Sequence, residues 1–228
     1  MFLTGQDLKG ELPQAQGQPV WLANDADCFA LSEAVDGAGE AGRVVFGIIL
    51  GTGCGGGLVV NRQLIVGPNA ITGEWGHNPL PGYDPALDGP SQPCYCGRDN
   101  CIERFVSGTG FAGRFVERHG RGLSPIGIIT AAAEGDVEAE AHYDHFIQAL
   151  ARSVASLINV LDPDVIVLGG GLSNIDRLYL DLPQALTPYL FSDRCITPMV
   201  PARYGDSSGV RGAAWLPSCV EGATTWAI

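Results

Sequence analysis

Basic residues are scarce in this sequence: its 228 residues hold 13 Lys and Arg against 25 Asp and Glu, a net charge of −12. A nucleic-acid surface needs a basic stripe to meet the phosphates, so this balance argues against DNA or RNA as a partner. No apolar run is long enough to cross a bilayer. The first residues also lack the basic and apolar segments of a secretory signal. These absences favour a cytoplasmic protein without membrane contact.

Two well-known phosphate motifs are also missing. No G-K-[ST] is present, which excludes a P-loop, and the G-x-G-x-x-G within 51–57 precedes an expected strand, which argues against dinucleotide binding. Glycine itself is abundant, with 32 residues, and it clusters at 51–57 and 169–171. Bare backbone N–H groups can approach a phosphate there, and Thr52 adds a hydroxyl. A tight hairpin at 51–57 and tight packing at 169–171 are the alternatives.

A metal site is indicated by Cys94, Cys96 and Cys101, spaced C-x-C-x4-C, with His77 upstream. Three thiolates and one imidazole form the ligand set of a closed, tetrahedral Zn²⁺ site. A disulfide or plain buried thiols are alternatives, but the seven cysteines are an odd number and a reducing compartment disfavours disulfides. We therefore expect zinc.

The other cysteines and two histidines are expected to have no metal. Free cysteine packs as a small hydrophobic residue, and this expectation applies to Cys28, Cys54, Cys195 and Cys219. His142 and His145 form an H-x-x-H on an expected helix, but no cysteine or carboxylate pattern accompanies them. We expect both to be surface residues.

Apolar periodicity predicts strands that alternate with helices, the pattern of an α/β protein. Strands are expected at 20–23, 43–50, 57–66, 164–168 and 196–203. Helices are expected at 26–35, at 105–119, twice within 125–161 with a break near 135–136, after 169–171 with Ser173 or Asn174 as its cap, and at 209–216. Segment 78–93, rich in proline and glycine, is expected to be an irregular loop.

Asn24 and Asp25 precede the helix expected at 26–35, and either side chain could cap it. A buried aspartate at such a position could also accept a proton from a sugar hydroxyl, and the two roles are compatible. Glu74 and Glu103 flank the expected zinc ligands in sequence, which suggests a site for a polar substrate.

Together these motifs resemble the ROK family of sugar kinases, over about residues 20–216. The motifs are NDADCFALSEA, GTGCGGG, GEWGHNPLP, CYCGRDNCIE, DPDVIVLGGGLSN and GDSSGVRGAAWL. They look most similar to the bacterial fructokinase branch, with N-acetylglucosamine kinases as close neighbours. The resemblance implies the actin-like, ribonuclease-H-like ATPase fold, with two lobes, and a homodimer. Residues 1–42 would be a remnant of the small lobe, 43–208 the large lobe with the zinc motif, and 209–228 a helix returning to the small lobe.

The resemblance also implies a reaction, the transfer of the γ-phosphoryl group of ATP to a hexose at O6, with fructose favoured and N-acetylglucosamine, glucose and mannose as alternatives. Mg²⁺ would accompany ATP, and zinc would be structural. Asp25 resembles the catalytic base. Sugar contacts would come from Asn24, Asp25, Glu74, His77 and Glu103. ATP would be bound by Gly51, Thr52, Gly53, Cys54 and Gly55 and by Gly169, Gly170 and Gly171.

Two departures from the family pattern are visible. The D-x-G-G-T phosphate loop, whose aspartate helps position Mg²⁺, is absent from this sequence, so we expect impaired turnover from an N-terminally truncated kinase. Asp27 stands where the family usually carries asparagine, and its charge could raise the pKa of Asp25 if the two lie close.

Three other functions remain as alternatives. A ROK transcriptional repressor would need a helix-turn-helix before Asn24 and a less acidic surface. A zinc hydrolase would need an open metal position, which four protein ligands leave no room for. A sugar-binding protein without catalysis is favoured by the missing phosphate loop, and sugar binding without ATP hydrolysis would support it.

Overall fold

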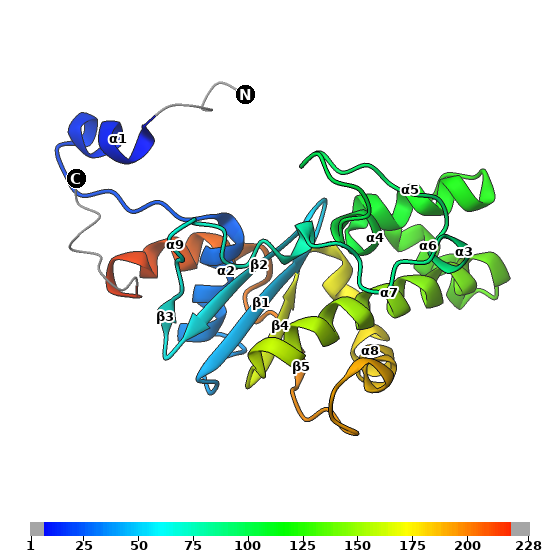
Figure 1. Cartoon of the computed structure of the whole chain (residues 1–228). Helices are drawn as coiled ribbons and strands as arrows, with labels where there is room; N and C mark the ends of the chain where they lie inside the picture. Colours follow the sequence, from blue (N-terminus) through cyan, green and yellow to red (C-terminus); the bar gives the residue numbers. More distant parts are fainter. Residues whose placement is uncertain (1–6, 220–228) are drawn as a thin grey trace.

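The computed structural model describes residues 7–219, which form one mixed sheet with helices on both faces (Figure 1). The strand order is β3-β2-β1-β4-β5. The strands are β1 (Val44–Leu50), β2 (Cys54–Val60), β3 (Gln63–Leu64), β4 (Val165–Gly169) and β5 (Met199–Pro201). β2 runs antiparallel to β1 and β3, whereas β4 runs parallel to β1 and β5. The expected α/β class is confirmed.

Helices come before, between and after the strands. They are α1 (Leu8–Gln16), α2 (Asp25–Val35), α3 (Pro85–Asp88), α4 (Glu103–Val106), α5 (Gly108–His119), α6 (Pro125–Ala133), α7 (Val137–Leu161), α8 (Leu178–Leu186) and α9 (Ser208–Cys219). Short 3₁₀ turns occupy Trp75–His77, Gly171–Asn174, Thr187–Tyr189 and Gly205–Ser207.

Successive strand residues point to opposite faces of the sheet, and helices bury both faces. In β1, Val45 belongs to the smaller core with α2 and α9, whereas Phe46 and Ile48 belong to the larger core with α4 to α8. Figure 1 shows α2 and α9 on one side of the sheet and α7 and α8 on the other. A sheet covered on both faces explains why β1 and β4 are almost wholly apolar.

Glycine in β2 lets α2 lie directly on the sheet. A Cβ at Gly57 would lie 2.8 Å from the carbonyl oxygen of Ala26 and 2.8 Å from Cβ of Ala30, so a larger residue there would push the helix away. On the other side of α2, a Cβ at Gly212 of α9 would overlap the Cys28 carbonyl. The position of α2, and of the residues at its start, is therefore fixed by close contacts on two sides.

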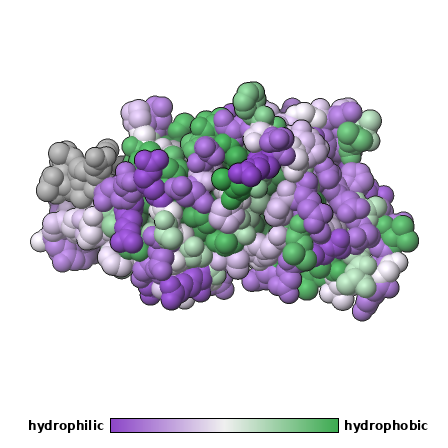
Figure 2. Space-filling model, turned by 90° about the horizontal axis from the view of Figure 1, so that it is seen from below, coloured by the Kyte–Doolittle hydropathy of each residue, from purple (hydrophilic) through white to green (hydrophobic). Residues whose placement is uncertain are grey.

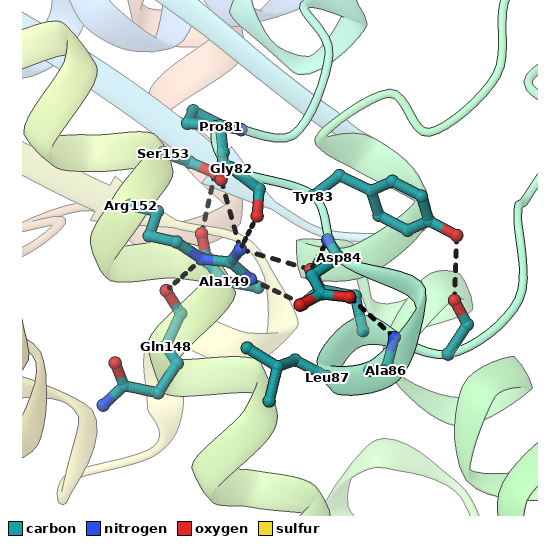
Figure 3. A network of polar contacts seen from close by, with 12 residues as sticks. Pro81, Gly82, Tyr83, Asp84, Ala86, Leu87, Gln148, Ala149, Arg152 and Ser153 are labelled. Carbon is teal, nitrogen blue, oxygen red and sulfur yellow. Dashed lines mark hydrogen bonds and ion pairs between the residues drawn. The ribbon is translucent and has the colours of Figure 1, made fainter.

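A buried ion pair fixes the loop that leads to the zinc motif (Figure 3). Arg152 of α7 donates to Asp88 of α3, with Nη2 2.5 Å from Oδ1, and Nη1 also donates to the carbonyls of Pro81 and Gly82 at 3.1 and 3.0 Å. Both charged side chains are nearly inaccessible, at 11% and 6% exposure, and a buried pair needs this many hydrogen bonds to offset its desolvation. Segment 78–93 is thus held against α7 although it is mostly irregular.

Several element predictions are confirmed, and others are wrong. The helix at 26–35, the break near 135–136 and the strand at 164–168 appear as expected, as α2, the α6–α7 junction and β4. No strand forms at 20–23, where the chain has no ladder partner. The helix expected at 105–119 is two helices, because Ser107 leaves helical geometry and caps α5 through its side chain.

The glycine segments also differ from expectation. Much of 51–57 lies inside β2 rather than in a loop, and the partner hairpin turns at Asn61 and Arg62, both with positive φ. After β4, a 3₁₀ turn intervenes, so neither Ser173 nor Asn174 caps α8; Ser173 donates its hydroxyl to the carbonyl of Gly170 instead.

His142 is not a surface residue, which corrects the prediction. It is 4% exposed, and Nε2 donates to the carbonyl of Phe111 at 2.8 Å, while its ring stacks against Phe111. Burial lowers the pKa of His142 to about 4, so it is neutral at physiological pH. His145, three residues on, is exposed as expected.

Hydrophilic side chains cover much of the face shown in Figure 2, with hydrophobic patches between them. Within residues 7–219, no helix combines the length and the apolar character needed to span a membrane.

Candidate functional site

The four expected zinc ligands converge. The donor atoms of His77, Cys94, Cys96 and Cys101 all lie within 4.8 Å of one another. Nδ1 of His77 is 3.5 Å from Sγ of Cys94, and Sγ of Cys96 is 3.5 Å from Sγ of Cys101. Two isolated β-bridges, Pro79 with Cys101 and Pro93 with Asp99, hold the segments that carry these ligands together. Segments 77–79 and 93–101 therefore meet at this cluster.

The spacing fits a zinc ion and does not fit a disulfide. Tetrahedral ligands about 2.3 Å from a metal are roughly 3.8 Å from one another, close to the distances in this cluster. A disulfide needs about 2.05 Å between sulfurs, and all seven cysteines are free. Hydrogen bonds from Arg98, chiefly from its backbone N–H, lower the pKa of Cys96 to about 6, whereas burial raises the pKa of Cys101 to about 12.

His77 connects this cluster to a polar surface. Its Nδ1 faces the thiols, whereas its Nε2 lies 2.8 Å from the hydroxyl of Tyr95 and 4.0 Å from Oε2 of Glu74. With Nδ1 on a metal, Nε2 carries the ring proton and becomes a donor. Tyr95 is 83% exposed, so a ligand could take its place beside His77.

The start of α2 reaches the same surface. Asn24 caps the helix, because its Oδ1 accepts from the N–H of Ala26 at 2.8 Å, and its Nδ2 lies 3.5 Å from Oε1 of Glu74. Oδ1 of Asp25 also accepts from Ala26, at 2.9 Å. Asp25 is exposed rather than buried, so its carboxylate is open to a ligand. Asn24, Asp25, Glu74 and His77 thus lie side by side, although 50 residues separate Asn24 from Glu74.

Asp27, whose pKa responds to burial and to the charges of Glu74 and Asp25, lies in an unusual environment. Its pKa is raised to about 6, mainly by burial and next by the charge of Glu74, with a smaller contribution from Asp25. Its Oδ1 is buried and, among the described residues, finds no hydrogen-bond partner. The sequence predicted an effect of Asp27 on Asp25; the structure places the raised pKa on Asp27.

Glu103 fastens the glycine segment to the metal cluster. Its Oε2 accepts from the N–H of Cys54 at 2.9 Å, and a Cβ at Gly53 would lie 2.7 Å from the same oxygen. Glu103 follows Cys101 by two residues. The pKa of Tyr95 is raised mainly by burial and next by the charges of Glu103 and Glu74. One carboxylate oxygen of Glu103 is therefore committed to the backbone.

A cavity of about 700 Å³ adjoins the start of the glycine segment, at Gly51 and Thr52. Its walls come from the β1–β2 turn, the start of α5, the start of α6, the turn after β4 and the turn before α9. They include Gly51, Thr52, Gly108, Thr109, Ser124, Gly170, Gly171 and Asp206. Gly170 has φ +81°, and a Cβ there would lie 2.6 Å from the carbonyl of Leu50, so only glycine fits.

Of the expected ATP residues, Gly51, Thr52, Gly170 and Gly171 line the cavity. Gly53, Cys54, Gly55 and Gly169 do not: Gly53 lies against Glu103, Cys54 is buried, and Gly169 packs on the ring of Phe29. Sequence reasoning missed Thr109, Ser124 and Asp206. Ser124, like Ser107, could have been found as a helix cap, because it precedes a helical stretch. Nothing in the sequence places Asp206 at this cavity wall.

The family model described as ROK family matches residues 1–219. The chain belongs to the ROK family. The N-acetyl-D-glucosamine kinase of Yersinia pseudotuberculosis serotype O:1b (strain IP 31758) is 43% identical to the chain over 215 residues, which are 93% of this chain and 71% of that protein.

Two solved structures of the family are also similar. The ROK hexokinase from Thermus thermophilus has a TM-score of 0.81 at 28% identity, covering 92% of this chain and 68% of that one. A ROK family glucokinase from Streptomyces griseus, solved with glucose and AMPPNP, has a TM-score of 0.76 at 27% identity, covering 92% and 72%. The chain therefore has the actin-like ATPase fold that the motifs predicted.

Proposed function

We propose that this ROK chain is a sugar kinase that transfers the γ-phosphoryl group of ATP to N-acetyl-D-glucosamine, at O6. Two observations support the proposal: the polar group of Asn24, Asp25, Glu74 and His77, and a cavity of about 700 Å³ that Gly51 and Thr52 line, just before Cys54, whose N–H donates to Glu103. The Yersinia pseudotuberculosis relative, named for N-acetyl-D-glucosamine, favours this sugar over the fructose that the motifs suggested.

On the acceptor side, Asp25 would take the proton of the attacking hydroxyl. It is exposed at the start of α2, and its neighbours offer both donors and acceptors for the other hydroxyls. Asn24 can donate, Glu74 can accept, and His77 donates from Nε2 when Nδ1 is bound to metal. Glu103 would accept with the oxygen that Cys54 leaves free. In-line transfer depends mainly on such positioning.

On the nucleotide side, backbone groups would do most of the binding. Gly51 and Thr52 would contact the phosphates, while Gly170 and Gly171 would lie along the adenosine. Thr109 and Ser124 offer hydroxyls, and Asp206 offers a carboxylate that can accept from ribose hydroxyls. ATP would bring Mg²⁺, which neutralises charge on the transferring phosphoryl group.

Zinc would be structural. Four protein ligands close its coordination sphere, so it supplies no activated water and serves to hold His77 and the loop that carries Glu103. This closed donor set also argues against a zinc hydrolase.

Lobe division and oligomeric state belong to the same proposal. The packing of α9 on α2 supports a small lobe made from residues up to 42 and from 209 onward, with 43–208 as the large lobe; residues 1–6 and 220–228 lie outside the described part. We propose a homodimer by likeness to the family, and light scattering of the purified chain tests it.

The test is sugar-dependent ADP release from MgATP, with N-acetyl-D-glucosamine, glucose, mannose and fructose in parallel and a control without sugar. We expect release that requires sugar and is fastest with N-acetyl-D-glucosamine. Because the sequence contains no D-x-G-G-T, calorimetric binding of N-acetyl-D-glucosamine is measured beside turnover. Sugar binding without any ADP release would favour the second candidate, a sugar-binding protein without catalysis. Faster release with fructose would overturn the choice of acceptor.

A further inference from the structure

Glu33 is a fully buried carboxylate in α2, with no measurable exposure. Four donors surround it. Oε2 accepts from the N–H of Ala38 at 2.8 Å and of Arg203 at 3.0 Å, while Oε1 accepts from the N–H of Tyr204 at 3.3 Å and the hydroxyl of Ser208 at 2.7 Å. Each oxygen thus has two donors, which is how a buried charge is kept without a cation in contact.

Three of these donors come from a segment about 170 residues away in sequence. Arg203 and Tyr204 belong to the connection between β5 and α9, and Ser208 is the first residue of α9. A second set of contacts joins the same two regions at Asp36: its carbonyl accepts from the Tyr204 hydroxyl at 3.0 Å, and its carboxylate pairs with Arg211 of α9 at 2.5 Å. Glu33 is the buried centre of this junction.

The two joined pieces carry opposite sides of the site. α2 begins at Asp25, the proposed base, and the connection contains Asp206, which lines the cavity proposed for the nucleotide. Asp206 lies in the short 3₁₀ turn Gly205–Ser207, directly between two of the Glu33 partners, Tyr204 and Ser208. Neither Asp25 nor Asp206 touches Glu33, so the carboxylate could act on the site only through these elements.

From this arrangement we infer that Glu33 is a positioning residue: it holds the Tyr204–Ser208 turn against α2 and thereby fixes the nucleotide cavity wall relative to Asp25. The inference rests on the proposed kinase function. It predicts an effect on nucleotide binding from a side chain that contacts neither substrate.

The variant Glu33→Gln keeps the shape and changes the hydrogen bonding in a defined way. The amide nitrogen cannot accept, and its best place is beside the Ser208 hydroxyl, which can turn and accept from it. The amide oxygen then still accepts from the N–H groups of Ala38 and Arg203. The N–H of Tyr204 loses its acceptor, because it now faces the amide NH₂ group, which is itself a donor. The change therefore falls on the turn that carries Asp206 and spares the start of α2.

The experiment measures the affinities of a non-hydrolysable ATP analogue and of N-acetyl-D-glucosamine separately, by calorimetry, together with the thermal midpoint. For Glu33→Gln we expect the analogue to bind roughly tenfold more weakly, the size of one lost charge-assisted hydrogen bond, while sugar affinity changes less than twofold. Asp88→Asn is the matched control: it also neutralises a buried carboxylate, but neither Asp88 nor its partner Arg152 lines the cavity, so analogue affinity should not change.

A Glu33→Gln protein that is destabilised but binds the analogue as the parent does would show a purely structural role and overturn the inference. If that variant does not fold, Ser208→Ala removes one of the four donors, and we expect analogue binding about threefold weaker; unchanged affinity there overturns the inference equally. A parent chain that binds neither ligand would refute the proposed function and, with it, this inference. If the parent chain binds both ligands and the analogue affinity is unchanged in Glu33→Gln or in Ser208→Ala, the inference is refuted but the proposed function is not.

Discussion

The two sides of the site are built by different means. The proposed acceptor side consists of side chains, namely Asn24, Asp25, Glu74 and His77, which lie beside a cluster of thiols and a helix cap. The proposed nucleotide cavity is lined in part by glycines, among them Gly51, Gly170 and Gly171, which directly follow strands β1 and β4. The first should therefore be sensitive to changes in ligand chemistry, and the second to any added side-chain volume.

The largest effect is expected where side-chain chemistry acts directly. Asp25→Asn removes the proposed base but retains an acceptor oxygen for Ala26, so folding and sugar binding should persist. Turnover should fall by about 10²- to 10⁴-fold, the usual contribution of a positioned general base. Sugar-dependent ADP release measures this, and turnover within threefold of the parent would remove Asp25 from the catalytic role.

The next effect tests whether thiols hold the acceptor side. Cys96→Ser should release the metal and weaken N-acetyl-D-glucosamine binding about tenfold or more, because His77 then loses its fixed tautomer and position. Elemental analysis and calorimetry measure the two results. Cys195→Ser, outside the cluster, is the control and should change neither. One metal per chain after Cys96→Ser would show that the ligand assignment is wrong.

The nucleotide side should respond to a single methyl group. Gly170→Ala places a Cβ 2.6 Å from the Leu50 carbonyl at φ +81°, which should cost about 2–3 kcal/mol of stability and deform the cavity. Gly113→Ala is the control, because nothing lies within 4 Å of a Cβ there and the position is helical. Denaturant unfolding and analogue binding compare the two variants; equal stabilities would contradict the account of Gly170.

The smallest effect concerns pH. The folded-state pKa of Asp27, about 6, lies above its unfolded value near 3.8, so the folded state holds the proton more tightly and stability falls as pH rises between these values. Asp27→Asn should remove this loss, raising the thermal midpoint by about 2–4 °C at pH 7.5, for about 1 kcal/mol after a discount for solvent screening. The gain should vanish near pH 4. A gain that is independent of pH would point to another cause.

The acceptor side was largely predictable from sequence, and the nucleotide side was only partly so. The C-x-C-x4-C spacing fixes three ligands within one loop, and Asn24 precedes a helix that it caps, so local pattern suffices. The cavity wall combines segments from five separate places, and the segment with Asp206 is brought there by the pairing of β5 with β4 and by the contacts of Tyr204 and Ser208 with Glu33. Long-range topology of that kind leaves no local signal.

The wrong predictions have a similar origin. His142 and His145 differ by three residues, and pattern alone did not show that α7 turns the first toward Phe111 and the second toward solvent. Residues 20–23 have strand composition but no neighbouring strand to pair with. No local signal in the sequence indicates that Glu33, within a helical motif, is a buried link between distant segments, because three of its four donors lie about 170 residues away.

The most direct test of the difference between the two sides is to remove the metal with a chelator and then titrate each ligand alone. The account predicts that N-acetyl-D-glucosamine affinity falls at least tenfold on metal removal and recovers with added Zn²⁺, while the affinity for a non-hydrolysable ATP analogue changes less than twofold. If the metal-free protein keeps its sugar affinity, or loses both affinities together, the two sides are not built as described.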